Sequence, residues 1–231
     1  MNAQKMNSFT KVPELGRSPT LTFGSRLAPN ALINEGGYLE IVLGPMFSGK
    51  TTRLIQAYKK YKYIGKQVVV INYAEDTRYD ATMLSTHDKI MIPCIQSKTM
   101  SEIWYDTSHS SHAQLKNADV ILINEGQFFQ DLYDIVLEMV DVYSKRVYIC
   151  GLDGDFQRNK FGRVLDLIPR CDKVDKLHSL CSKCRNGTEA IFSHRITTES
   201  SQIVIGSDNY IPLCRNCYVR ENSTGLDRAC V

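Results

Sequence analysis

The feature that most constrains this chain is the segment Gly44–Thr51 (GPMFSGKT), which fits the pattern G-x-x-x-x-G-K-[ST]. Glycines at these positions let consecutive backbone N–H groups point into one concavity and hold phosphate oxygens. A following helix aims its electropositive N-terminus at the same place. In such a loop Lys50 reaches the β- and γ-phosphates and the Thr51 hydroxyl ligates Mg²⁺. The predicted phosphate contacts are Gly44, Pro45, Met46, Phe47, Ser48, Gly49, Lys50 and Thr51.

The flanking sequence supports this interpretation over that of a plain glycine turn. Tyr38–Leu43 is short, apolar and rich in β-branched residues, which is typical of a buried strand. Lys50–Ile64 has the length of a helix. A strand before the loop and a helix after it are the context that favours nucleotide binding.

Similar units recur along the chain. Gln67–Asn72, Asp119–Asn124 and Arg146–Cys150 read as further buried strands, and Asp131–Tyr143 carries apolar residues at helical spacing. Apolar strands that alternate with helices indicate a parallel sheet covered on both faces. The predicted class is therefore α/β, with a P-loop (RecA-like) parallel sheet and a small zinc-binding appendage.

Composition narrows the classes of protein. With 43% hydrophobic and 23% charged residues, the 231-residue chain is ordinary for a globular protein, which excludes a collagenous, coiled-coil or disordered chain. No apolar run approaches the roughly 18–20 residues that span a bilayer, so we expect a soluble protein. The net charge of +3 does not by itself favour nucleic acid.

The N-terminal stretch is open to two interpretations, a transit peptide or a disordered tail. Its bases lack an amphipathic apolar stripe, which favours the tail. The expected organisation is a tail over 1–36, a P-loop domain over 37–176, a zinc-binding domain over 177–218 and a C-terminal tail over 219–231.

Two cysteine pairs, CSKC and CRNC, stand 29 residues apart and predict a zinc site. Four thiolates without an open position indicate a structural ion, whereas a redox dithiol needs only one pair. His178 and His194 lie nearby, but we expect neither to be a ligand because the thiolates fill the shell. No secretory signal is legible, so we expect reduced, intracellular cysteines. The predicted ligands are Cys181, Cys184, Cys214 and Cys217.

Over about residues 38–218 the sequence resembles the type II thymidine kinase family, the cellular and poxvirus-like class. The matching segments are LGPMFSGKTT (43–52), YAEDTRYD (73–80), STHD (85–88), NEGQFF (124–129), GLDGDFQRNKFG (151–162) and the two cysteine pairs. The resemblance implies transfer of the γ-phosphoryl group of ATP to the 5′-hydroxyl of thymidine, giving dTMP and ADP for DNA precursor synthesis. It also implies a homotetramer, feedback inhibition by dTTP and a cytoplasmic enzyme that binds neither nucleic acid nor membrane.

Glu125 follows the strand Asp119–Asn124, at the edge where α/β sheets bind ligands. A lone glutamate there favours a surface acid, but the resemblance implies the catalytic base. It further implies that Lys50 and Arg158 offset developing charge. Asn124 stands where the family usually has Asp, which leaves the shape but removes a charge beside Mg²⁺; we expect a higher half-saturating Mg²⁺ concentration.

The resemblance also implies contacts with phosphate and base. The planar guanidinium of Arg78 either donates hydrogen bonds to phosphate oxygens or forms an ion pair on the surface. Apolar residues near the loop line the thymidine pocket or, on sequence alone, belong to the core. The resemblance further implies a loop, called the lasso, that recognises the base through its backbone N–H and C=O groups. On sequence alone the same segment is an edge strand. The additional phosphate contacts are Asp76, Thr77, Arg78, Asn124 and Gln127; the pocket residues are Met46, Phe128, Leu152, Phe156 and Phe161; the lasso residues are Gln202, Ile203, Val204, Ile205, Gly206 and Tyr210.

Two other functions stay open at this point. One is a P-loop ATPase whose zinc ribbon binds nucleic acid, which predicts basic residues and exposed aromatic side chains around the knuckles. The other is a nucleotide sensor without catalysis, which the neutral Asn124 permits.

Overall fold

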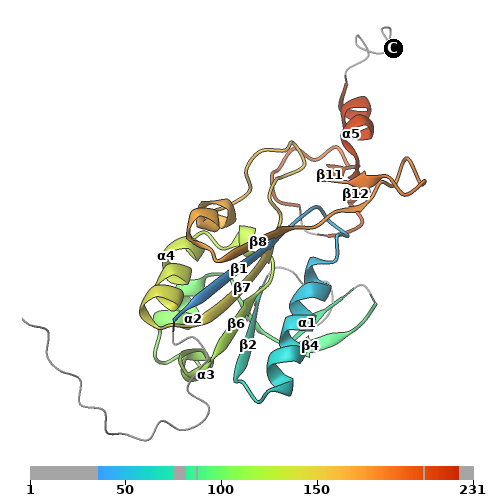
Figure 1. Cartoon of the computed structure of the whole chain (residues 1–231). Helices are drawn as coiled ribbons and strands as arrows, with labels where there is room; N and C mark the ends of the chain where they lie inside the picture. The colour runs from blue at the N-terminus through green and yellow to red at the C-terminus, as the bar shows by residue number, and fades with distance from the viewer. Residues whose placement is uncertain (1–35, 75–81, 87, 205, 224–231) are drawn as a thin grey trace, which may run out of the picture. The chain divides into compact units, whose positions relative to one another are not determined.

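The computed structural model describes residues 36–74, 82–86, 88–204 and 206–223. Its centre is a six-stranded sheet in the order β5-β2-β6-β7-β1-β8 (Figure 1). Every neighbouring pair is parallel, so the predicted α/β class is confirmed. The strands are β1 (Tyr38–Leu43), β2 (Val68–Tyr73), β5 (Ile95–Ser97), β6 (Val120–Ile123), β7 (Arg146–Gly151) and β8 (Lys173–Lys176).

The central strands are buried on both faces, which is why each reads as a continuous apolar run. β1 has the predicted bounds, and β2, β6 and β7 lie within one residue of theirs at each end. The edge strand β8 has no apolar run because three of its four residues are charged. Charges on an edge discourage pairing with another chain.

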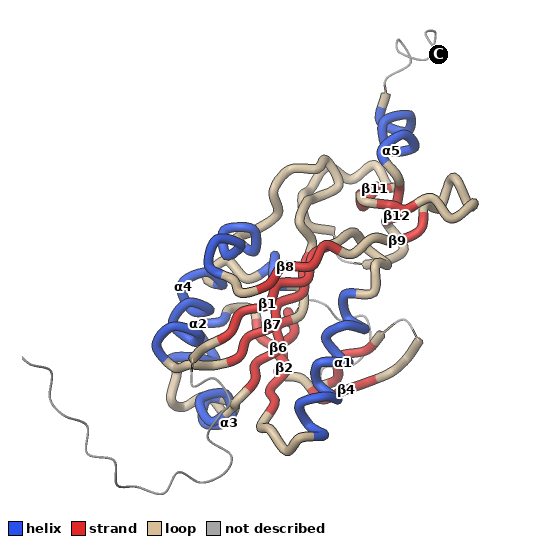
Figure 2. The backbone as a smooth tube through the Cα atoms, viewed as in Figure 1, coloured by secondary structure: helices blue, strands red, loops and turns tan. Residues whose placement is uncertain are grey.

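Helices cover both faces of the sheet, as Figures 1 and 2 show. One face packs against α1 (Lys50–Tyr63) and the hairpin of β3 (Met83–Ser85) and β4 (Met91–Pro93). The opposite face packs against α2 (Met100–Tyr105), α3 (His112–Asn117), α4 (Leu132–Leu137), the π-helix η2 (Glu138–Val142) and the 3-10 helix η3 (Val164–Arg170).

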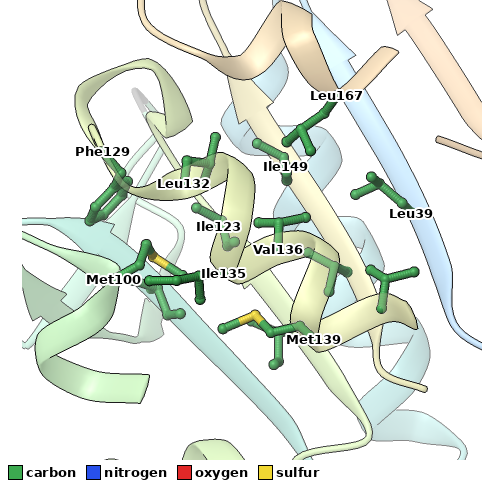
Figure 3. Packing of buried hydrophobic residues seen from close by; sticks show 14 of the residues in the cluster. Leu39, Met100, Ile123, Phe129, Leu132, Ile135, Val136, Met139, Ile149 and Leu167 are labelled. Carbon is green, nitrogen blue, oxygen red and sulfur yellow. The ribbon is translucent and has the colours of Figure 1, made fainter. Parts of the chain in front are cut away.

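The core on the α4 side fixes the sheet that carries the site. In Figure 3, Ile123 and Ile149 from the strands meet Leu132, Val136 and Met139 from the covering helix. All five side chains are fully buried. Truncation of one such residue to alanine costs about 2–5 kcal/mol, so this face is held firmly against the sheet.

The predicted single helix over Asp131–Tyr143 is only partly correct. The α-helix ends at Leu137, and a π-helix continues to Val142. The N–H of Tyr143 reaches the carbonyl of Glu138 at 3.1 Å, five residues back. Apolar spacing holds through both parts, so periodicity does not reveal the wider turn.

After β8 the chain forms two small antiparallel sheets and a final helix. These elements are β9 (Ser179–Leu180), β10 (Glu189–Ala190), β11 (Phe192–Arg195), β12 (Tyr210–Leu213) and α5 (Arg215–Asn222). Their buried cluster centres on Cys181, Ala190, Leu213, Cys214 and Tyr218. Among the described residues, every helix is too short or too polar to traverse a bilayer.

Candidate active site

The phosphate loop joins the end of β1 to the start of α1. Gly44 has φ of 149°, and a Cβ there would lie 2.6 Å from the Leu177 carbonyl oxygen. Gly49 has φ of 84°. Both positions require glycine, because other residues rarely adopt these angles. The Lys50 ammonium donates to the Pro45 carbonyl at 2.7 Å, which holds this side chain across the loop.

The chemistry of the loop fits an anion. The Ser48 hydroxyl is buried, and among the described residues it has no hydrogen-bond partner. The first turn of α1 contains no acidic residue, so nothing there offsets the positive end of the helix. A buried hydroxyl beside a helix N-terminus and a lysine is suited to phosphate oxygens.

Glu125 stands at the carboxyl end of β6, on the wall of the same cavity. Its backbone is left-handed, with φ of 53° and ψ of 44°, and the 3-10 turn η1 (Gly126–Phe128) follows it. Non-glycine residues seldom adopt this conformation, and it turns the chain sharply out of the sheet. The half-buried carboxylate is therefore presented to the cavity from a fixed turn.

Gln127 lies behind Glu125, completely buried. Its Nε2 donates to Glu125 Oε2 at 2.7 Å, and its Oε1 accepts the Leu152 N–H at 3.0 Å. Glycines enclose it closely. A Cβ at Gly151 would lie 2.8 Å from Gln127 Oε1, and a Cβ at Gly162 would lie 2.2 Å from the Gln127 carbonyl oxygen. The structure thus does not bring Gln127 to the cavity wall, although the sequence predicts a phosphate contact.

A chain of amides crosses the carboxyl ends of three strands. Asn124 Nδ2 donates to Asn72 Oδ1 at 2.8 Å, and Asn72 Nδ2 donates to Gln96 Oε1 at 3.3 Å. Gln96 Nε2 in turn faces Cys94 Sγ at 3.6 Å. Asn124 is 2% exposed and lines the cavity with Asn72. In this chain Asn124 and Asn72 each donate through Nδ2, and Asn72 and Gln96 each accept through the side-chain oxygen.

The cavity has a volume of about 390 Å³ and brings together most of the predicted site. Phe128 and Phe161 form an aromatic wall of the cavity, with perpendicular rings whose centroids are 5.5 Å apart. Tyr73 supports Phe128 by stacking on it, with ring centroids 5.0 Å apart. The predicted residues on the lining are Met46, Phe47, Ser48, Gly49, Lys50, Thr51, Asn124, Glu125, Phe128, Leu152, Phe156, Phe161, Gln202, Ile203, Val204, Gly206 and Tyr210.

Sequence reasoning missed part of this lining. The missed residues are Thr52, Asn72, Met83, Leu84, Ser85, Thr86, Asp88, Gly154, Asp155 and Ser193. The matching segments quoted above gave a signal for six of them, namely Thr52, Ser85, Thr86, Asp88, Gly154 and Asp155. The predicted contacts Asp76, Thr77, Arg78 and Ile205 lie outside the described residues.

Arg158 does not line this cavity. It is exposed, and its guanidinium stacks 4.8 Å from the Tyr218 ring centroid and 5.5 Å from that of Phe192. Its backbone is left-handed, with φ of 69°. A catalytic role for Arg158 stays a prediction.

The four cysteines converge as predicted. Their Sγ atoms all lie within 4.8 Å of one another, and Cys184 Sγ is 3.8 Å from Cys214 Sγ. A tetrahedron with Zn–S bonds of about 2.3 Å has sulfur atoms about 3.8 Å apart. Although burial opposes ionisation of the Cys181 thiol, backbone N–H groups of the two knuckles lower its pKa to about 6. The cluster therefore fits a closed metal site.

The cysteine region contacts the phosphate loop directly. The Met46 N–H donates to Ser193 Oγ at 2.9 Å, and the Ser179 hydroxyl donates to the Phe47 carbonyl at 3.2 Å. These two hydrogen bonds thus attach the cysteine region to the phosphate loop.

Comparison with known proteins gives a consistent result. A family model described as thymidine kinase matches residues 37–218. A thymidine kinase of Yaba monkey tumor virus is 39% identical over 191 residues, covering 82% of this chain and 99% of the viral one. Thymidine kinase 1 of Dictyostelium discoideum is 37% identical, covering 82% of this chain and 81% of its own. A thymidine kinase of rice, Oryza sativa subsp. japonica, is 38% identical, covering 85% and 71% respectively.

Proposed function

Because the chain belongs to the thymidine kinase family, we propose that it phosphorylates thymidine with ATP in the cavity between the phosphate loop and the aromatic wall. The observation that supports this site best is the placement of Glu125 at the edge of the phosphate loop's cavity, held from behind by Gln127.

The reaction is an in-line displacement. The thymidine 5′-oxygen attacks the γ-phosphorus, the bond from that phosphorus to the bridging oxygen breaks, and ADP leaves with the electron pair. Glu125 accepts the proton of the 5′-hydroxyl. Lys50 and the N–H groups of the loop stabilise charge on the phosphates. Gln127 keeps the carboxylate oriented, because its amide is fixed between Glu125 and Leu152.

The base binds against the aromatic wall. A nucleobase needs flat apolar surfaces, and the aromatic rings on the cavity lining offer them. Residues of the lasso (the described residues 202–204, 206 and 210) line the same cavity. The proposed base contacts are Met46, Phe128, Leu152, Phe156 and Phe161.

Two metals belong to this proposal. Zinc is structural, because four thiolates close its shell and hold both ends of the lasso. Thr51 would hold Mg²⁺ with the nucleotide, and Asn124 stands where an Asp of the family would help to hold this ion. When bound, Mg²⁺ neutralises charge on the β- and γ-phosphates.

The nucleic-acid ATPase is less well supported. The basic side chains near the knuckles are engaged: Lys183 pairs with Glu221 at 3.1 Å, and Arg215 covers Phe192. The aromatic Tyr218 is buried, so it offers no stacking platform.

We also propose, on family grounds, a cytoplasmic homotetramer that dTTP inhibits. We place the boundary between its two domains between residues 176 and 177.

The test is ADP release from Mg·ATP with and without thymidine, in the wild type and in Glu125→Gln. We expect thymidine-dependent turnover that falls by about 10²–10⁴-fold in the variant. Glu221→Gln is the matched control, since its exposed ion pair contributes little to stability. Turnover that ignores thymidine but rises with single-stranded DNA would favour the ATPase. Binding of ATP without turnover on any nucleoside would favour the sensor.

A further inference from the structure

The loop after β7 contains a buried carboxylate with no part in the reaction described above. Asp155 is 6% exposed and lines the cavity. Its Oδ1 accepts the N–H groups of Gln157 and Asn159, each at 2.9 Å. Its Oδ2 accepts Gln202 Nε2, also at 2.9 Å. Because three protein donors already bind this carboxylate, it is better placed to hold the lasso than to bind a substrate.

A buried guanidinium also binds the lasso and the turn before it. Arg195, at the end of β11, is 5% exposed. One terminal nitrogen donates to the Glu199 carbonyl at 2.9 Å and to the Ser201 carbonyl. The other donates to the Gln202 carbonyl at 3.1 Å and to the Tyr210 hydroxyl at 2.6 Å. The turn that leads into the lasso is therefore fixed by one side chain.

Arg195 also reaches the same loop as Asp155. Its Cζ lies 3.8 Å from the centroid of the Phe156 ring, one of the proposed base contacts. Among the described residues no carboxylate forms an ion pair with Arg195. Neutral oxygens and a ring face provide part of the compensation that a buried charge needs, whereas Arg195 Nε has no hydrogen-bond partner among the described residues. Asp155 carries the opposite charge and binds the Gln202 side chain.

Gln202 thus connects two buried, oppositely charged residues from different parts of the chain. Its side chain binds Asp155, and its backbone carbonyl binds Arg195. Figure 2 shows the long connection between β11 and β12 in which Gln202 lies. These bonds order part of the connection in advance, and any part left to be ordered on binding weakens affinity.

We propose that Asp155, Gln202 and Arg195 form a brace that sets the lasso over the nucleoside side of the cavity before substrate binds. They are positioning residues, and the inference rests on the proposed function, since it assigns their effect to thymidine affinity. The hydrogen bonds described for the brace go to the loop after β7 and to the lasso, so the brace should affect thymidine KM more than ATP KM or kcat.

Exchange of the two side chains tests the bond. In Gln202→Glu two carboxylates face each other at the 2.9 Å contact, and we expect thymidine KM to rise about tenfold or more. In Asp155→Asn the new amide keeps Oδ1 for the loop, and the Gln202 amide can turn to accept from it. We expect a rise within about threefold. The double variant restores a donor–acceptor pair with reversed polarity, so its KM should return to within about threefold of wild type.

Gln114→Glu, on the exposed side of α3, is the control for added charge. A double variant no better than Gln202→Glu alone would overturn the brace. Equal rises in both KM values with a lowered melting temperature would also overturn it, because that result indicates a merely structural contact.

A readout without substrate separates this inference from the proposed function. Hydrogen exchange of peptides covering residues 199–204 should accelerate in Gln202→Glu and slow again in the double variant. If the wild type does not phosphorylate thymidine but this exchange pattern holds, the proposed function fails and the brace stands. If thymidine is phosphorylated and the exchange is equal in all variants, the brace fails alone.

Discussion

Replacement of Asn124 by Asp tests the neutral amide chain at the centre of the site. Asn124 Nδ2 donates to Asn72 Oδ1 at 2.8 Å, and Asn72 donates onward to Gln96. The substitution replaces the donor by an oxygen, so two acceptors face each other at that distance. Asn72 can relieve this by rotating its amide, and Gln96 must then rotate as well, which leaves Gln96 Oε1 facing the weak donor Cys94 Sγ.

The cost follows from this rearrangement. The reversed chain ends on a weak thiol donor, and a carboxylate is introduced at a position 2% exposed; together these lower the free energy of unfolding by about 1–3 kcal/mol without Mg²⁺. For a chain of this size the melting temperature falls by roughly 2–4 °C for each kcal/mol. Bound Mg²⁺ should reverse part of the loss, because the added carboxylate lies beside the predicted metal position, and the half-saturating Mg²⁺ concentration should fall.

The assay is thermal unfolding with ADP, at Mg²⁺ concentrations from zero to saturation, beside steady-state turnover. Asn117→Asp makes the same chemical change at the exposed end of α3 and controls for charge. Identical melting of Asn124→Asp and wild type without Mg²⁺ would refute the directional amide chain. An unchanged half-saturating Mg²⁺ would refute the role of Asn124 beside the metal.

Three further outcomes are expected. Gln127→Met removes the donor to Glu125 while filling similar volume; the acidic limb of the kcat–pH profile should move to higher pH and kcat should fall by about tenfold, with ATP KM unchanged. Cys184→Ser should abolish the one equivalent of zinc measured by metal analysis and raise thymidine KM, because the ends of the lasso lose their anchor. Burial raises the pKa of Cys150 to about 12, so the folded state keeps the thiol neutral while the unfolded chain ionises near pH 9; stability should fall with pH between these values, and Cys150→Ala should flatten that fall in urea unfolding curves.

The sequence predicts the sheet well because its strands are buried on both faces. Such strands leave continuous apolar runs, as in β1 and β6. β8 leaves no such run, since its burial alternates along an edge. The change from α to π geometry after Leu137 is invisible for a related reason: buried apolar residues such as Val136 and Met139 face the core in both parts.

The candidate site likewise contains residues that the sequence predicts and residues that it does not. Residues of the phosphate loop are predictable because backbone geometry dictates their type at each place. Direction is not predictable from spacing, as Gln127 shows: two residues after Glu125, it turns back to the carboxylate instead of facing the cavity. Asp155 was missed because a charged residue in a polar loop suggests a surface acid, and only the fold brings Gln202 to it.

The bonds from the cysteine region to the phosphate loop have a thermodynamic consequence. Met46 N–H to Ser193 Oγ and Ser179 hydroxyl to the Phe47 carbonyl join the part that carries the lasso to the part that holds phosphates. If nucleoside binding stiffens this junction, linkage requires that it change nucleotide affinity by the same factor as nucleotide binding changes nucleoside affinity. Under the proposed function we therefore expect the ligand that binds first to lower the ordering cost for the second.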